Sequence, residues 1–292
     1  MKRGRGQAPW RGTADQARWR ASFDELGALY NREELLPTDP VMFLHRNDDP
    51  ATIERTGLLA AGLAFGGVPQ IQRSVEAALS LAGHLEDPSR ITSALAGLRH
   101  RWATGADIAV LLTGARVLQA HHGSLEAVFL SHDDQGSDYT AALTGLRHDL
   151  LEAGRSATGL HAGTPLMPDP AAGSAAKRWH LLLRWLIRRD EVDRGIWTSG
   201  TPGRLLMPLD THIFRISRRL GLTDRRTPGL AAAREITALL RKLDPYDPVR
   251  WDFALTRLGM LGICAVDTPD CSSCPLQGTC LEANARNPRT NP

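Results

Sequence analysis

The stretch Cys264-Ala-Val-Asp-Thr-Pro-Asp-Cys-Ser-Ser-Cys-Pro-Leu-Gln-Gly-Thr-Cys280 contains all four cysteines of the 292-residue chain. Its spacing, C-x6-C-x2-C-x5-C, places four thiols on one short loop, whereas a disulfide framework would distribute them along the chain. Four such thiolates suit a [4Fe-4S] cluster. Tetrahedral zinc and inert buried thiols are the alternatives, but structural zinc sites usually use two tight C-x2-4-C pairs. We therefore predict that Cys264, Cys271, Cys274 and Cys280 ligate a [4Fe-4S] cluster.

Outside this loop, apolar residues recur at helical spacing, and clusters of glycine and proline separate the segments. The sequence therefore predicts an all-α protein. The expected helices cover residues 51–65, 68–82, 104–121, 125–131, 139–154, 177–190, 210–220, 228–243 and 248–263. Residues 159–176 and 199–203 contain too many breakers for a helix, so we predict connections there.

The charge of the chain is concentrated at its N-terminus. The net charge is +3, and residues 1–20 carry six Lys and Arg residues against one Asp. We expect residues 1–20 to be a disordered, solvated basic arm, with contact to a polyanion as the alternative.

No segment of the sequence has the character of a membrane span. The longest nearly apolar stretch, residues 57–68, is shorter than the roughly 18 to 20 residues that a spanning helix needs. No apolar segment of the kind found in secretory signals follows the basic N-terminus. These features favour a cytoplasmic protein with no membrane partner.

Two motifs carry a resemblance to a known family. The cysteine spacing resembles the cluster loop of the endonuclease III and adenine glycosylase branch of the helix-hairpin-helix DNA glycosylases. The stretch Pro208-Leu-Asp-Thr-His-Ile-Phe-Arg-Ile-Ser-Arg-Arg219 is similar to the segment in which these enzymes carry Asp-Thr-His. Taken alone, Asp210 would be interpreted as a helix N-cap. The resemblance implies that Asp210 is the catalytic aspartate and that the cluster organises the C-terminal lobe without taking part in base removal. We expect His212 to be a structural hydrogen-bonding residue, with a general base as the alternative.

Bifunctional members of this family also carry a lysine at the start of the helix that follows the hairpin. Lys177 is the best match, because it follows the turn-like residues 170–176 and opens the predicted helix 177–190. A desolvated lysine can act as a neutral amine nucleophile, whereas arginine stays protonated. The alternative is an ordinary cation near a helix N-terminus. We expect Lys177 and Asp210 to be the catalytic residues.

The chain also departs from the family pattern. The glycine-rich hairpin core is absent, and the separation of Lys177 from Asp210 is longer than usual, with residues 188–207 resembling an insertion. The longer spacing is reminiscent of the archaeal 8-oxoguanine glycosylase branch. The sequences of residues 60–67, 190–197 and 208–222 are similar to those of an uncharacterised bacterial family of this superfamily.

The resemblance implies a two-lobed helix-hairpin-helix fold. Residues 21–45 and 205–285 would form an iron-sulfur lobe, residues 46–204 a central helical barrel that supplies Lys177, and residues 286–292 a tail. The implied activity is excision of a damaged, oxidised base from double-stranded DNA, with AP-lyase activity through a lysine Schiff base. The spacing favours 8-oxoguanine, whereas the cysteine loop favours oxidised pyrimidines.

A glycosylase must rotate its target nucleotide out of the duplex, which exposes a base that aromatic side chains can stack on. The candidates near the motifs are Phe65, Trp179, Trp185 and Trp197, although a tryptophan on a helix stripe is more often a core residue. Candidates for contacts with DNA phosphates are Arg178, Arg215, Arg218 and Arg219, with a solvated helix face as the alternative. We expect a monomer in the cytoplasm, associated with the nucleoid, with DNA containing a damaged base or an abasic site as its partner. A noncatalytic iron-sulfur protein that binds DNA or senses redox state, and a glycosylase for a modified undamaged base, are the alternatives.

Overall fold

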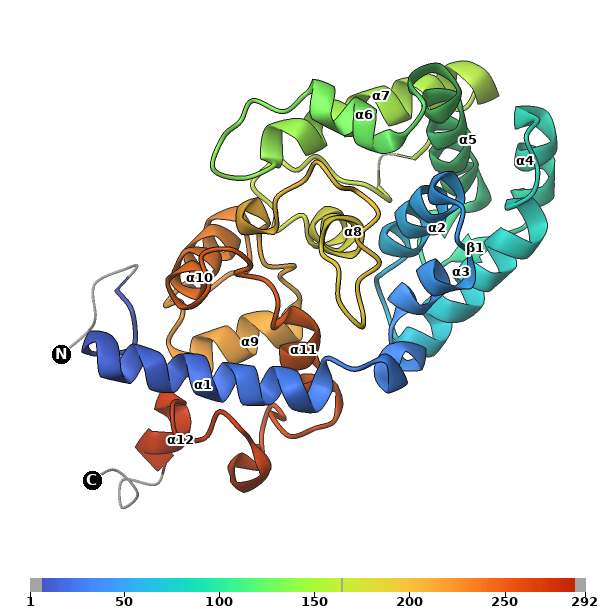
Figure 1. The fold of residues 1–292 in the computed structure, drawn as a ribbon. Helices are drawn as coiled ribbons and strands as arrows, with labels where there is room; N and C mark the ends of the chain where they lie inside the picture. The colour runs from blue at the N-terminus through green and yellow to red at the C-terminus, as the bar shows by residue number, and fades with distance from the viewer. Residues whose placement is uncertain (1–6, 164, 287–292) are drawn as a thin grey trace. The chain divides into compact units, whose positions relative to one another are not determined.

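A computed structural model describes residues 7–163 and 165–286 of the chain. The described residues are mainly helical, which confirms the all-α prediction, and each predicted helix is found with its ends shifted by at most four residues. Residues 1–6 of the expected arm and 287–292 of the expected tail lie outside the described residues. The chain divides into two compact units (Figure 1). Unit 1 contains residues up to 33, 173–180 and those from 201 onward, and unit 2 contains residues 34–172 and 181–200.

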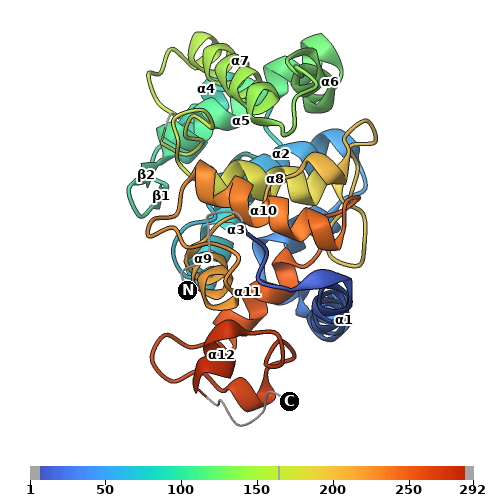
Figure 2. The ribbon, with the colours of Figure 1, turned by 90° about the vertical axis from the view of Figure 1, so that its left-hand side faces the viewer.

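Unit 2 is built mainly from helices that lie between residues 50 and 158. They are α2 (Pro50–Gly62), α3 (Val68–Ala82), α4 (Pro88–Leu95), α5 (Gly105–His122), α6 (Leu125–Ser131) and α7 (Thr140–Thr158). The two short strands β1 (Arg99–His100) and β2 (Ala103–Thr104) pair antiparallel as a hairpin just before α5 (Figure 2). A 3-10 helix covers Pro40–Arg46, and another, Glu33–Thr38, joins the two units along the chain.

The helices α5 and α7 lie side by side (Figure 1) because two glycines allow their backbones to approach. A Cβ atom on Gly114 would lie 2.1 Å from the carbonyl oxygen of Leu150, and one on Gly154 would lie 2.0 Å from that of Val110. Asp107 fixes the start of α5, where it and Thr104 form a capping box and its Oδ1 atom accepts a hydrogen bond from the Gly163 backbone N–H. These contacts define the centre of unit 2.

The segment after α8 (Lys177–Ile187) is anchored by a buried charge network. Asp193, whose side chain is fully buried, accepts from both Arg184 and Arg188, and Arg188 also pairs with Asp190 at 2.8 Å. The part of the suspected insertion that lies in unit 2 is therefore a folded loop. Trp197 is 3% exposed, and its indole N–H donates to Glu54 at 2.7 Å.

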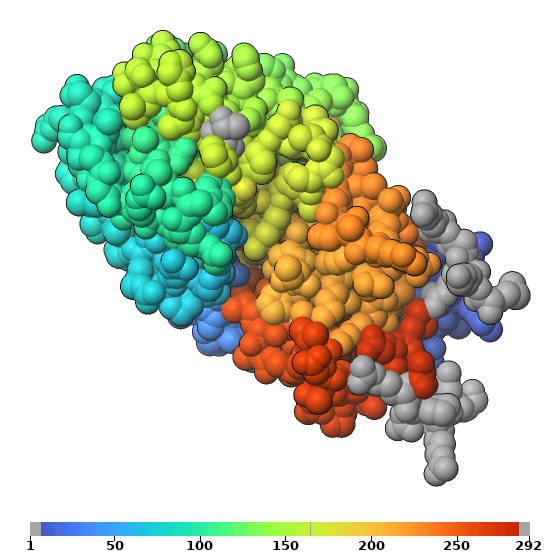
Figure 3. Space-filling model, turned by 180° about the vertical axis from the view of Figure 1, so that it is seen from behind, coloured from blue at the N-terminus to red at the C-terminus, as the bar shows by residue number. Residues whose placement is uncertain are grey.

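Unit 1 forms around a second core that residues near both chain ends share. Its helices are α1 (Gly12–Tyr30), α9 (Thr211–Leu220), α10 (Leu230–Leu243), α11 (Asp252–Met260) and α12 (Leu281–Arg286), together with the first residues of α8. Two 3-10 turns cover Pro202–Arg204 and Cys271–Ser273. The red atoms of the C-terminal segment lie against the orange atoms of the α9–α11 region (Figure 3).

The helix α1 corrects the expectation of a disordered arm through residue 20. Its buried residues Trp19, Phe23 and Leu26 lie on one face, and Phe23 meets Trp251 edge-on with ring centroids 5.2 Å apart. Burial of this aromatic face stabilises the helix although most of its other residues are polar. Two basic residues of this helix are paired as well, since Arg18 contacts Asp15 and Arg20 contacts Asp24, each at 2.8 Å.

The boundaries between the units differ from the expected lobes in three places. Residues 173–180, which include Lys177, belong to unit 1 with Asp210, residues 34–45 belong to unit 2, and residues 201–204 belong to unit 1. The first difference arises because the turn before α8 docks on α10, where the Leu230 N–H donates to the Gly173 carbonyl at 3.1 Å. Among the described helices, none combines the length and the apolar character that crossing a membrane requires.

Candidate functional site

Asp210 lies at the start of α9 and has two separate tasks for its two oxygen atoms. Its Oδ1 atom accepts a hydrogen bond from the Ile213 N–H at 2.8 Å, so the residue is the N-cap of the helix. Its Oδ2 atom lies 3.7 Å from the Nζ atom of Lys177. The cap thus fixes the orientation of the carboxylate, because a capping side chain has little rotamer freedom left.

Lys177 is the first residue of α8, and the backbone that precedes it is unusual. Ala176 has φ +44°, in the left-handed region that non-glycine residues avoid, and Gly173 has φ +81°. The Ala176 carbonyl accepts from the N–H groups of Trp179 and His180, which begins the helix directly after the turn. A non-glycine residue in this region costs about 1 kcal/mol or more. Backbone strain next to a candidate catalytic lysine fits a functional site in which the position of the lysine is kept although this costs stability of the fold.

The structure therefore brings together the two residues that were predicted as catalytic. The Lys177 side chain is 32% exposed and that of Asp210 is 18% exposed, so both remain accessible to a ligand. An amine and a carboxylate at this separation can exchange a proton through a small movement or a reacting group placed between them. Next to them, burial lowers the pKa of the Arg178 guanidinium to about 10, so it still carries its charge at neutral pH.

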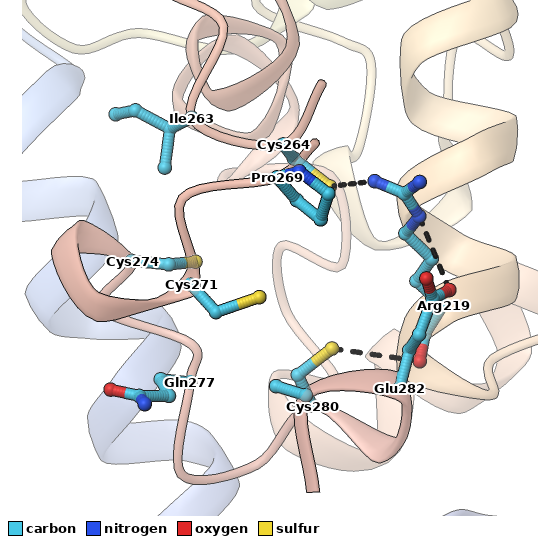
Figure 4. Close-up of a pocket in the computed structure, with 10 residues that line it drawn as sticks. Arg219, Ile263, Cys264, Pro269, Cys271, Cys274, Gln277, Cys280 and Glu282 are labelled. Atoms are coloured by element: carbon cyan, nitrogen blue, oxygen red, sulfur yellow. Dashed lines mark hydrogen bonds and ion pairs between the residues drawn. The ribbon is translucent and has the colours of Figure 1, made fainter. Parts of the chain in front are cut away.

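The four cysteines line one cavity in the loop between α11 and α12 (Figure 4). They come from three places: Cys264 follows α11, Cys271 begins the 3-10 turn and Cys274 directly follows it, and Cys280 directly precedes α12. Asp270 caps that turn, because its Oδ1 atom accepts from the Ser273 N–H at 3.3 Å, and its carboxylate also accepts from the hydroxyls of Ser272 and Ser273. These hydrogen bonds lower the pKa of Asp270. All four thiols are unpaired by disulfides.

The arrangement of these thiols bears on the kind of metal group that they could hold. Within residues 7–163 and 165–286, no three side chains of His, Cys, Asp or Glu are grouped to hold a metal ion. Four thiolates on one loop are ligands that either a [4Fe-4S] cluster or a single tetrahedral ion can use. Burial raises the pKa of the Cys274 thiol to about 11, so the positive charge of a bound metal group is what would favour its thiolate.

Two of the arginines that were predicted to contact DNA phosphates hold the cysteine loop. Arg219 donates to the Cys264 Sγ atom at 3.1 Å and to the carbonyls of Ala265 and Val266 at 2.6 Å (Figure 4). Arg215 donates to the Cys264 carbonyl at 2.8 Å. Contact of these two residues with DNA phosphates stays a prediction, and in this structure their Nη atoms donate to the loop.

The remaining arginine candidates differ in their surroundings. Arg218 is exposed on α9, whereas Arg178 is partly buried. The groove beside Arg218 is also lined by the carboxylates of Asp224 and Glu282, which reduce its positive charge. Arg215 also lies 3.2 Å from the Nδ1 atom of His212, and the His212 ring packs on Gly259, which agrees with the structural role expected for this histidine.

The tryptophans that were predicted to stack on a base are core residues. Trp179 and Trp185 are 0% exposed, and Trp197 is held by Glu54 as described above. The structure agrees with the core alternative for all three, because rings without exposed faces cannot receive a base. Phe65 is only partly buried and stacks on Trp102, an exposed residue that the sequence analysis missed. Its signal in the sequence is a tryptophan that directly follows three polar residues in Arg99-His-Arg-Trp102.

The family described as "Protein of unknown function (DUF2400)" matches residues 39–261. The match covers more than half of the chain, so the protein belongs to this family. Lys177 and Asp210 lie within the matched residues, whereas the four cysteines lie beyond them.

Proposed function

We propose that this protein is a DNA glycosylase that removes a damaged, oxidised base and cleaves the resulting abasic site through a Schiff base on Lys177. The observation that carries the proposal is the 3.7 Å separation of Lys177 Nζ and Asp210 Oδ2, with Asp210 oriented by its cap on α9. The resemblance of the Asp-Thr-His segment and of the cysteine spacing to helix-hairpin-helix glycosylases supports it.

The pair can carry out the reaction in a sequence of balanced steps. Asp210 accepts a proton from the Lys177 ammonium, and the neutral amine forms a bond to C1′ of the target nucleotide while the bond from C1′ to the base breaks. The base leaves with the bonding electron pair and takes up a proton. Opening of the sugar then gives an iminium, and loss of a 2′ proton breaks the C3′–O bond by β-elimination. The carboxylate also stabilises positive charge that develops on the sugar.

The four cysteines are proposed to hold a [4Fe-4S] cluster. Bound there, it would supply a cross-link between the end of α11 and the start of α12. Arg219 and Arg215 on α9 would position the loop around it through the hydrogen bonds to Cys264, Ala265 and Val266.

Trapping with sodium borohydride tests the proposed chemistry directly. The wild-type protein is incubated with duplexes that contain an abasic site, 8-oxoguanine, thymine glycol or uracil, because hydride adds to the iminium and leaves a stable amine. We expect a covalent protein–DNA product that is abolished in Lys177→Gln. Lys242→Gln, which changes a lysine in the last turn of α10, is the matched control and should trap as the wild type does.

The lesion that traps best would name the substrate class. Base release without trapping would overturn the lysine mechanism and leave a monofunctional glycosylase in which Asp210 activates water. Absence of both trapping and release, with DNA binding retained, would overturn the enzymatic proposal in favour of a noncatalytic DNA-binding protein.

The cluster is tested by iron and sulfide content and by visible absorbance. We expect Cys274→Ser to give a colourless protein that unfolds at a lower temperature, because one ligand is lost. Ser272→Ala in the same loop is the control and should keep its iron, since Ser272 contacts only Asp270 among the hydrogen bonds of its side chain. A colourless wild-type protein with bound zinc would contradict the cluster assignment.

A further inference from the structure

Unit 2 exposes an ordered pair of aromatic rings at the turn between α2 and α3. The rings of Phe65 and Trp102 are stacked, with centroids 4.4 Å apart and planes inclined by 8°. Trp102 is 48% exposed, which is unusual for so large an apolar side chain. Such a surface is a flat platform of the size and chemistry of a nucleobase.

The platform is fixed from below by His100, which is fully buried. The Nε2 atom of His100 donates to the Phe65 carbonyl at 2.9 Å, so its Nδ1 atom accepts from the Ser74 hydroxyl at 2.8 Å. The imidazole ring also meets Phe65 edge-on at 4.6 Å. Because β1 and the α2–α3 turn are both tied to this histidine, the two rings are ordered before any ligand arrives.

The β1–β2 hairpin holds Trp102 in place, and the turn of this hairpin contains a strained backbone conformation. Arg99 pairs with Thr104 and His100 with Ala103, so Arg101 and Trp102 form the two-residue turn. Arg101 has φ +54°, a conformation that favours glycine. Its side chain lies across Gly66, where a Cβ atom would be 3.1 Å from the Arg101 Cδ atom. Strain of this kind is typical of positions selected for function.

The charges around the platform suit a nucleic-acid strand. Arg99 and Arg101 are both exposed, and residues 96–106 contain these two arginines and no acidic residue. A stacking aromatic surface flanked by arginines is the usual way in which proteins hold an unstacked base and its adjoining phosphates.

We propose that the Phe65–Trp102 pair binds an unstacked nucleobase of a DNA strand, with Arg99 and Arg101 at the neighbouring phosphates. The proposal rests on the proposed function only in that DNA is the ligand, because the platform uses none of the residues of the Lys177–Asp210 site. Loss of the stacking ring should weaken binding roughly 5-fold to 100-fold, the range that stacking on one base provides.

The test is fluorescence anisotropy at fixed salt with two labelled duplexes of one sequence, one intact and one with a stable abasic-site analogue that leaves the opposite base unpaired. We expect Trp102→Ala to weaken binding to the abasic duplex about 10-fold, and Trp102→Phe to keep most of the affinity. Tyr246→Ala is the control, since Tyr246 is an exposed aromatic residue, 84% exposed, in the other unit. Repeated over a series of salt concentrations, the same measurement on Arg101→Gln should show a reduced salt dependence of binding.

The outcomes separate this proposal from the enzymatic one. If the wild type binds the duplexes and Trp102→Ala binds them equally well, the platform proposal is overturned whatever the trapping experiment gives. If DNA binds and depends on Trp102 while no lesion traps or is released, the platform stands and the enzymatic proposal fails. If no duplex binds at all, both are overturned. Thermal unfolding of Trp102→Ala at the wild-type temperature excludes misfolding as the cause of a loss.

Discussion

The helix α8 carries two very different pairings of a cation with a carboxylate, one at its beginning and one near its end. At its beginning, Lys177 faces Asp210 across 3.7 Å, and both side chains are partly exposed. Near its end, Arg184 and Arg188 enclose Asp193, and none of these three side chains is more than 5% exposed. Burial raises the pKa of Asp193 to about 6, so it is an ionised carboxylate at neutral pH. The open pair has the accessibility that chemistry requires, whereas the closed one fixes the loop that follows.

The largest effect is expected when the open pair is broken without a change of shape. Asparagine is as good an N-cap as aspartate, so Asp210→Asn should keep α9 intact and remove the proton acceptor. We expect base release or trapping to slow by about 100-fold to 10,000-fold, the usual contribution of a general acid–base group. Single-turnover rates measure this effect, and the urea unfolding curve should match that of the wild type. A rate within a few-fold of the wild type would show that the carboxylate only caps the helix.

Breaking the closed pair should reduce the stability of the fold, whereas Asp210→Asn should reduce the reaction rate and leave the stability unchanged. Asp193→Ala leaves two buried guanidinium groups with fewer carboxylate partners, which typically costs about 3–5 kcal/mol of stability. Urea unfolding at neutral pH measures the free energy of unfolding. Asp134→Ala, which changes a carboxylate of a surface loop in the same unit, is the control and should change it by less than about 0.5 kcal/mol. A stability loss in Asp193→Ala no larger than that of the control would mean that the network is not a structural anchor.

The smallest effect on stability is expected for Asp190, which pairs with Arg188 beside Asp193, and this effect depends on pH. Although burial raises the pKa of Asp190, the charge of Arg188 and the N–H groups of Asp193 and Val192 outweigh it and lower the pKa to about 2 from its ordinary 3.8. The carboxylate therefore stabilises the folded state above about pH 4, and this contribution disappears as the pH falls to about 2.

Asp190→Asn tests that sign, because asparagine keeps the side-chain oxygen that accepts from the backbone of Val192 and Asp193. Thermal unfolding of both proteins between about pH 2 and pH 6 gives the comparison. The wild type should be more stable at pH 6, and the two curves should converge at the acidic end. A difference that grows as the pH falls would contradict the lowered pKa.

Periodicity and breakers were sufficient to predict most of the helices, because their buried faces are marked by regular apolar spacing. They missed α1, in which three buried residues lie among polar ones, and the short α4, which covers only Pro88–Leu95. In α1, packing against distant residues decides the structure. The helix α4 does carry local signals that the prediction missed, since Asp87 caps it and Pro88 is its first residue.

The candidate site was predictable where a motif marks it and not elsewhere. Asp210 and Lys177 were named from the sequence, and the structure places them together. The tasks of Arg215 and Arg219 could not be predicted, since an arginine that binds a phosphate and one that binds distant carbonyls look alike in a sequence. The burial of Trp179 and the exposure of Trp102 depend in the same way on neighbours that lie far along the chain.

The helix α9 both orients Asp210 and anchors the cysteine loop, and this double role limits how its sequence can change in evolution. The helix has ten residues, so it is about 15 Å long, and it carries Asp210 at one end and the anchors of the cysteine loop toward the other. A descendant that lost the loop between α11 and α12 would leave Arg215 and Arg219 without the backbone carbonyls to which they donate, on the helix that orients Asp210. Such a lineage would have to replace both arginines, or rebuild the loop around them, before the other end of the helix could vary freely.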